Sequence, residues 1–235
     1  LRSITARNRL VVSPMCQYSA GLGIANDWHF AHLARFALGG FGTVTVEATA
    51  VSPEGRITHG DLGLWNDEQM VPLAHIAAFL KGHGAVPAIQ LGHAGRKGSA
   101  QRPWEGDAAM TAQDLIERAE APWRTYAPSA IPHNDGWLVP EELDQAGIDR
   151  IREAFVAATR RADAAGFSIV EIHCAHGYLM NEFLSPIANK RTDSYGGSLE
   201  NRMRFALETI EAARAVWPQD KPLFVRISAI DGVEG

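Results

Sequence analysis

The chain has 235 residues, of which 46% are hydrophobic and 21% are charged, and its formal net charge is −5. This composition is typical of a globular protein large enough to bury a substantial core. The mildly acidic balance argues against nucleic acid as the main partner, and no stretch approaches the ~18 apolar residues that a membrane span needs. With only two cysteines, a disulfide framework is not expected, and a cytoplasmic location is the default.

Short apolar segments alternate with longer amphipathic segments along the chain. The strand candidates are rich in Val and Ile, as strands covered on both faces should be, and they span residues 9–13, 43–47, 86–91, 167–173 and 222–228. Helical patterns span residues 28–38, 67–81, 141–165 and 199–216. Asn66 and Ser198 are suitable N-caps for the second and the fourth of these helices. The alternation predicts parallel βα units within one domain that covers residues 1–235.

Each predicted strand ends in a polar residue. These residues are Ser13, Glu47, Gln90, His173 and Arg226. Because burying such a group without a partner costs about 1–3 kcal/mol, the repetition indicates side chains that converge on a shared ligand. The carboxyl ends of the strands form the active face of a (β/α)8 TIM barrel, which we favour over a doubly wound open sheet. With five of eight strands visible, we expect about the first five βα units and an incomplete C-terminus.

The segment EIHCAHGYL, residues 171–179, follows directly on the fourth predicted strand. His173 and His176 are three residues apart, a spacing that suits neither strand nor helix pairs of metal ligands, so no metal site is predicted. Two interpretations stay open. The histidines are either satisfied by neighbouring carbonyls, or they are two N–H donors that hold one carbonyl or nitro oxygen and stabilise charge developing on it. In the second case Tyr178 could serve as a general acid.

Cys16 lies in the segment SPMCQY at the end of the first predicted strand. Three roles are open for it: a soft side chain that faces a cofactor, a small buried hydrophobic residue, or a thiol nucleophile with His173 or His176 as its base.

Gln90 and Arg226 end the third and the fifth strand. A fixed amide and a fixed cation suit a ligand whose edge alternates hydrogen-bond acceptors and donors, and the cation would stabilise an anion formed when that ligand is reduced. The alternative for Arg226 is an ion pair with Glu47 or Glu171.

Together these motifs resemble the Old Yellow Enzyme family of flavoprotein reductases, and in particular its thermophilic-like branch, which contains the xenobiotic reductases. The matching stretches are RNRLVVSPMCQY, VEATAVSPEGRIT, IQLGHAGRK, RPWEGD, EIHCAHGYLMNEFLSPIANKRTDSYGGSLENRMRF and PLFVRIS. The family fold is a (β/α)8 barrel that binds FMN, with NADPH or NADH as reductant. The resemblance implies reduction of activated C=C bonds in α,β-unsaturated carbonyl (enone) or nitro compounds, by a homodimer or homotetramer when full length.

The resemblance also implies roles for single residues. His173 and His176 would hold the activating oxygen of the substrate, Tyr178 would donate a proton, and Tyr18 would face the substrate, with Lys97 close to the flavin pocket. Flavin contacts are implied for Ser13, Pro14, Met15, Cys16, Ala48, Gln90 and Arg226. The family's phosphate-binding loops are expected beyond this sequence. The alternatives are a relative with an added iron–sulfur cluster, such as the dienoyl-CoA reductases, and an inactive barrel fragment.

Overall fold

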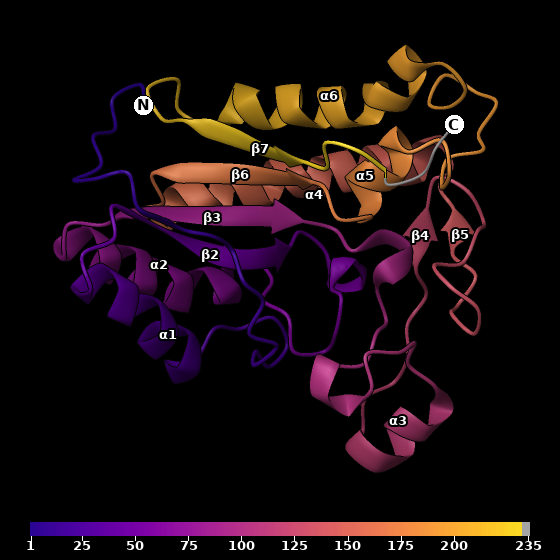
Figure 1. Cartoon of the computed structure of the whole chain (residues 1–235), viewed down its shortest axis with the longest axis horizontal. Helices are drawn as coiled ribbons and strands as arrows, with labels where there is room; N and C mark the ends of the chain where they lie inside the picture. The colour runs from indigo at the N-terminus through magenta and orange to yellow at the C-terminus, as the bar shows by residue number, and fades with distance from the viewer. Residues whose placement is uncertain (232–235) are drawn as a thin grey trace.

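The computed structural model describes residues 1–231, and its central feature is a five-stranded parallel sheet. The strands, in spatial order, are β1 (Val11–Val12), β2 (Thr43–Ala50), β3 (Val86–Gly92), β6 (Ile169–Cys174) and β7 (Leu223–Ile227). All of them point the same way (Figure 1). Because spatial order follows chain order, the described sheet has no reversal of the kind at which a doubly wound fold changes direction.

Four longer helices connect successive strands. They are α1 (Asp27–Leu38), α2 (Asp67–Gly82), α4 (Gln145–Ala164) and α6 (Leu199–Val216). The two predicted N-caps are confirmed: the Asn66 side chain accepts a hydrogen bond of 3.1 Å from the Gln69 N–H, and Ser198 accepts one of 3.3 Å from the Asn201 N–H. None of the helices within residues 1–231 is both long and apolar enough to cross a membrane.

The chain makes a long excursion between β3 and α4, at the carboxyl ends of the strands (Figure 1). Its elements are the 3₁₀ turns Gly95–Lys97 and Pro103–Glu105, helix α3 (Ala112–Arg118) and the short strands β4 (Tyr126–Ala127) and β5 (Glu141–Glu142). The predicted start of the third helix at residue 141 is therefore wrong. Residues 141–142 pair with β4, and α4 begins only after Asp144, which caps it by accepting a 2.7 Å bond from the Gly147 N–H. Two further elements escaped prediction, the 3₁₀ turn Pro53–Gly55 and helix α5 (Leu179–Leu184).

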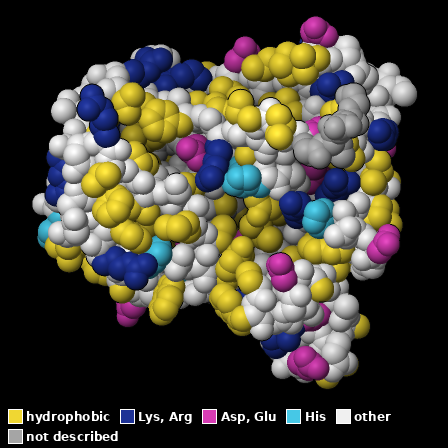
Figure 2. Space-filling view, viewed as in Figure 1, with side chains coloured by type: hydrophobic (Ala, Val, Ile, Leu, Met, Phe, Trp, Pro, Cys, Tyr) yellow, Lys and Arg dark blue, Asp and Glu magenta, His cyan; other side chains and the backbone are white. Residues whose placement is uncertain are grey.

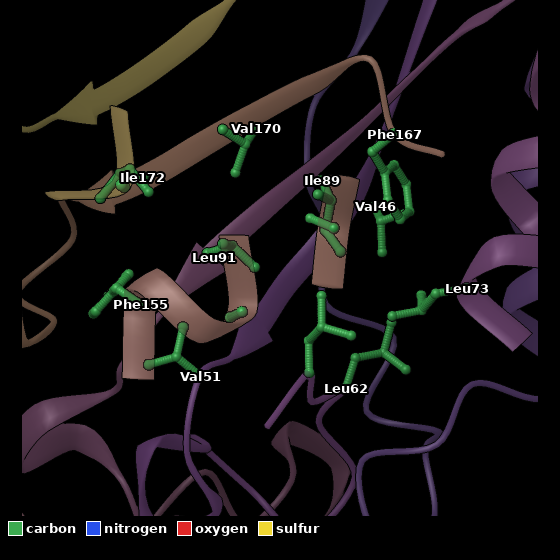
Figure 3. Close-up of a cluster of buried hydrophobic side chains, with 14 of the residues drawn as sticks. Val46, Val51, Leu62, Leu73, Ile89, Leu91, Phe155, Phe167, Val170 and Ile172 are labelled. Carbon is green, nitrogen blue, oxygen red and sulfur yellow. The ribbon is translucent and has the colours of Figure 1, made fainter. Parts of the chain in front are cut away.

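The helices cover one face of the sheet, and the main hydrophobic core lies between these two layers. Figure 3 shows side chains from β2, β3 and β6 packed with side chains from the helices and loops, among them Val46, Ile89, Leu91, Val170, Ile172, Leu73 and Phe155. Alternate residues of the same strands point to the opposite face. There Val86, Ala88 and Ile169 form a smaller cluster, covered in part by Ile4 near the N-terminus.

Candidate active site

Toward the carboxyl ends of the strands, this second face changes from apolar to polar. In the strand register Ala48 lies opposite Gln90, Gln90 opposite Glu171, and His173 opposite Arg226. The Gln90 amide donates a hydrogen bond of 2.7 Å to the Glu171 carboxylate. The structure thus brings four of the predicted residues together and adds Glu171. The sequence held a signal for Glu171, because a residue two positions before His173 on a strand shares its face.

The ion pairs that the sequence offered as an alternative for Arg226 are not formed within residues 1–231. The Glu171 carboxylate accepts a hydrogen bond from Gln90, and the Glu47 carboxyl group accepts one of 3.1 Å from the backbone N–H of Gln17. Both carboxyl groups therefore have partners other than the guanidinium of Arg226.

His173 and His176 converge through a turn after β6. His173 is 3% exposed, and its Nδ1 accepts a hydrogen bond of 3.2 Å from the Ala175 N–H, which leaves the ring proton on Nε2. His176 has a left-handed backbone with φ of 61°, and its N–H donates to the Ser228 hydroxyl at 3.0 Å. The two ring centroids lie 5.0 Å apart with their planes at 86°.

Tyr178 completes this group of rings. Its ring centroid lies 5.1 Å from that of His173 and 6.5 Å from that of His176. Burial raises the pKa of the Tyr178 hydroxyl, with a smaller contribution from the neighbouring Cys16, so the phenol keeps its proton at neutral pH. A proton donor and two imidazoles therefore share one corner of the sheet.

The imidazoles are held neutral by their surroundings. The pKa of His173 is lowered to about 3, mainly by burial and to a smaller extent by the nearby His176 and Arg226. The pKa of His176 is lowered by burial and by the charges of Arg226 and Lys97. In Figure 2 histidine side chains lie beside Lys or Arg side chains on this face of the molecule. Among the described residues neither ring bonds a backbone carbonyl, so the interpretation as carbonyl-satisfied histidines is not supported. Neutral imidazoles offer an N–H donor to an electronegative atom.

No three His, Cys, Asp or Glu side chains in the described part of the chain are grouped so that they could hold a metal ion.

The loop after β1 approaches the same corner. Ser13 and Met15 are exposed, whereas Pro14 and Cys16 are half-buried. Burial raises the pKa of the Cys16 thiol, and the carboxylates of Asp61 and Glu47 raise it further, while the backbone N–H of Ala48 opposes them. A reactive thiol needs a lowered pKa, so the surroundings of Cys16 do not favour the thiol-nucleophile alternative.

Tyr18 follows in this loop with a left-handed backbone at φ of 52°. Its ring meets the ring of Trp104 edge to face, with centroids 6.0 Å apart. The Arg102 guanidinium donates to the Tyr18 carbonyl oxygen at 3.3 Å. Because Arg102 and Trp104 both belong to the excursion between β3 and α4, that segment fixes the position of Tyr18.

A cavity of about 10 Å³ lies beside His173 and Tyr178. It has room for about one water molecule. Its lining includes Ala48, Asp61, His93, His173 and Tyr178. Asp61 and His93 were missed by sequence reasoning. Burial raises the pKa of Asp61 to about 6 and lowers that of His93 to about 4. Asp61 stands in none of the matching stretches and at no predicted strand end, whereas His93 lies within the stretch IQLGHAGRK, which could have identified it.

Comparison with known proteins identifies the family. The model of the NADH:flavin oxidoreductase / NADH oxidase family matches residues 1–235. The chain belongs to this family. An NADPH dehydrogenase of Geobacillus thermodenitrificans (strain NG80-2) is 46% identical over 232 residues, which are 98% of this chain and 62% of that protein.

Solved structures agree with this assignment. Morphinone reductase, also solved in complex with tetrahydroNAD, matches with a TM-score of 0.81 and 28% identity over 97% of this chain and 60% of its own. The Old Yellow Enzyme from a Pichia species matches with a TM-score of 0.81 and 27% identity over 95% of this chain and 56% of its own. The predicted resemblance is confirmed, and the sequential sheet is part of a (β/α)8 barrel. This chain spans about 60% of the length of these relatives.

Proposed function

We propose that this protein is an FMN-dependent NAD(P)H oxidoreductase, an ene-reductase that reduces activated C=C bonds of α,β-unsaturated carbonyl or nitro compounds. The observation that carries the proposal is the pair of neutral imidazoles, His173 and His176, with ring centroids 5.0 Å apart beside the protonated Tyr178. Family membership and the morphinone reductase complex with tetrahydroNAD support a nicotinamide reductant.

The residues at the strand ends fit a flavin. Gln90 presents an amide held by Glu171, and Arg226 supplies a cation that neither Glu47 nor Glu171 neutralises. We assign Gln90, Arg226 and Ala48 to the isoalloxazine ring, and Ser13, Pro14, Met15 and Cys16 to its neighbourhood. The chemistry that FMN supplies when bound is hydride transfer between a nicotinamide and an acceptor.

The chain's own residues perform the remaining tasks. His173 and His176 direct ring N–H groups at the carbonyl or nitro oxygen of the substrate and stabilise the negative charge that develops there. Tyr178 holds the proton that the α-carbon of the substrate receives, and Tyr18 contacts the substrate. Because both imidazoles are neutral, they donate hydrogen bonds to this oxygen without delivering a full proton.

The test uses the full-length protein loaded with FMN, with 2-cyclohexenone as acceptor. Replacing both histidines (His173→Ala with His176→Ala) should abolish most enone turnover, while the yellow flavin absorbance and its bleaching by NADPH persist. An exposed histidine provides the matched control, His75→Ala, which should leave turnover unchanged. Unchanged turnover in the double variant would refute the assignment. Iron and sulfide analysis of the same preparation separates this proposal from an iron–sulfur relative.

A further inference from the structure

Glu47 occupies an irregularity of the sheet. The register of β2 against β3 shifts between Val46 and Ala48, which leaves Glu47 as the extra residue of a bulge. The Thr49 hydroxyl donates a hydrogen bond of 2.8 Å to the Glu47 carbonyl oxygen and fixes this bulge. A bulge changes the direction of a side chain. The carboxyl group that results is buried, with 3% of the side chain exposed.

This carboxyl group connects two segments that are distant in the sequence. One oxygen, Oε1, accepts a hydrogen bond of 3.1 Å from the backbone N–H of Gln17, the residue directly after Cys16. The other, Oε2, lies 4.0 Å from Nε2 of His29 at the start of α1. The His29 ring is itself held by Asn26, whose backbone N–H lies 3.2 Å from Nδ1. Nε2 of His29 is buried and has no hydrogen-bond partner among residues 1–231.

The titratable groups that face Glu47 are His29 from α1, Cys16 and Tyr18 from the loop after β1, and Asp61 from the loop before α2. Burial raises the pKa of Glu47 to about 8, opposed by the Gln17 hydrogen bond and helped by Asp61. Burial lowers the pKa of His29 to about 4. Near pH 7 the Glu47–His29 pair is therefore neutral on both sides. A charge appears on Glu47 only in the alkaline range.

We propose that Glu47 is the positioning residue for Cys16: its carboxyl group holds the Cys16–Gln17 backbone in place, and its negative charge opposes ionisation of the Cys16 thiol. The backbone at Gln17 cannot move away from β2 without breaking the bond to Glu47. A thiolate at the half-buried Cys16 would also interact with the Glu47 carboxylate, and like charges repel. The inference rests on the proposed function only for its consequence at the flavin.

The first experiment needs no flavin. Alkylation of Cys16 by iodoacetamide is followed by peptide mass spectrometry in the full-length apo-protein between about pH 7 and about pH 10, which covers the ordinary thiol pKa. Glu47→Gln keeps an acceptor oxygen for the Gln17 N–H but removes the charge. The thiol should ionise at lower pH, and its alkylation rate in the alkaline range should rise several-fold. Glu47→Ala also removes the anchor and should raise the rate further.

The matched control is Glu153→Gln on the exposed side of α4, which should reproduce the parent profile. Coincident pH profiles for the parent and both Glu47 variants would overturn the proposal. If Cys16 is alkylated faster in Glu47→Ala but at the parent rate in Glu47→Gln, the proposal that the Glu47 charge opposes ionisation of the thiol would be overturned. Should Glu47→Ala fail to fold, the profile of Glu47→Gln alone decides.

A second measurement follows the consequence at the flavin. In the FMN-loaded protein Glu47→Gln should shift the flavin reduction potential to more positive values in the alkaline range, where the parent carries the carboxylate, and leave it unchanged near pH 6. A potential shift that is equal at both pH values would contradict the role of the Glu47 charge. Failure of the parent to bind FMN would instead refute the proposed function and leave the alkylation result standing.

Discussion

The Lys97 ammonium donates a hydrogen bond of 2.7 Å to the backbone carbonyl oxygen of His176. His176 and Gly177 both have left-handed backbones, with φ of 61° and 71°, and such a conformation is disfavoured for a residue with a Cβ atom. The Lys97 side chain also packs against Gly177, where an added Cβ would lie 3.1 Å from Lys97 Cε. Lys97 therefore stabilises the turn that presents the His176 ring.

Replacing Lys97 by methionine should weaken this turn while keeping most of the side-chain volume. A hydrogen bond to a charged group contributes about 1.5–3 kcal/mol, and partial exposure reduces that value, so we expect kcat/KM for 2-cyclohexenone to fall about tenfold. Reduction of the flavin by NADPH, measured by stopped-flow absorbance, should change less. Lys81→Met on α2 is the control for loss of one lysine. Equal losses in the two half-reactions would contradict a role centred on His176.

Acid should destabilise the fold through its buried neutral histidines. Burial lowers the pKa of His173 to about 3 and the pKa values of His29 and His93 to about 4, whereas an unfolded histidine titrates near ~6.5. Between about pH 6.5 and about pH 4 these histidines bind protons in the unfolded chain but not in the folded chain, so their contribution to the free energy of unfolding decreases as the pH falls. Buried carboxyl groups with raised pKa values act in the opposite direction, so the histidine contribution is measured as the change between about pH 7 and about pH 5 in the difference between the urea midpoints of the parent and of a histidine variant.

His93→Asn tests the source of this acid sensitivity. The asparagine oxygen can still accept the Gly95 N–H, which now bonds His93 Nδ1 at 3.1 Å, but asparagine does not titrate. The stability of the variant relative to the parent should therefore increase between pH 7 and pH 5. The variant His75→Asn, at an exposed histidine, should follow the parent. Parallel urea midpoints for all three proteins would show that burial of His93 has no part in the acid response.

Glu182 should have the opposite pH dependence. It is 1% exposed, its Oε1 accepts a 2.9 Å bond from the Arg96 N–H, and burial raises its pKa to about 8. Above about pH 4.5 the folded chain keeps the Glu182 proton that the unfolded chain releases. The contribution of Glu182 to the free energy of unfolding therefore decreases as the pH rises, until the folded chain also releases the proton at about pH 8. The variant Glu182→Gln keeps an oxygen that can accept the Arg96 N–H, but it does not titrate and so does not lose stability at high pH.

The stability difference between Glu182→Gln and the parent should therefore shift in favour of the variant by about 2 kcal/mol between pH 6 and pH 9. Urea unfolding at both pH values measures it. The exposed Glu153→Gln provides the baseline, with a difference that does not change with pH. A pH-independent difference for Glu182→Gln would mean that this carboxyl group is already ionised at pH 6.

The fold was predictable wherever local signals and burial agree. Helix α6 was predicted with its observed bounds, because Ser198 caps its start and Pro218 follows its end. Strand β1 is shorter than predicted: only residues 11–12 pair with β2, and Leu10 and Val11 are 58% and 56% exposed. An apolar run indicates a strand, but pairing depends on neighbours that the run does not specify.

The candidate site was partly predictable for a similar reason. The convergence of Gln90, His173 and Arg226 followed from polar residues at the ends of parallel strands, which meet at one edge of a sheet. Asp61 could not be found in this way, because it lies in a loop between β2 and α2 and reaches the cavity only through the tertiary fold. The local sequence pattern predicts which residues of a strand share a face, but it does not predict where a loop residue lies in the folded protein.

Gly95, at the start of the excursion between β3 and α4, leaves no room for a side chain. Its φ is 64°, and an added Cβ would lie 2.1 Å from Oε1 of the buried Glu182. Gly95→Ala therefore combines a disfavoured backbone with a steric clash that would displace Glu182 from the Arg96 N–H. We expect a loss of about 3 kcal/mol or more in the free energy of unfolding.

Gly136→Ala separates the two causes, because Gly136 also has a positive φ, 79°, but open space where its Cβ would be. This control should cost only about 1 kcal/mol, the backbone contribution alone. Urea unfolding of both variants gives the difference, and thermal melting followed by circular dichroism checks it independently. Equal losses in the two variants would mean that the contact between Gly95 and Glu182 relaxes freely, and that backbone conformation alone selects glycine at residue 95.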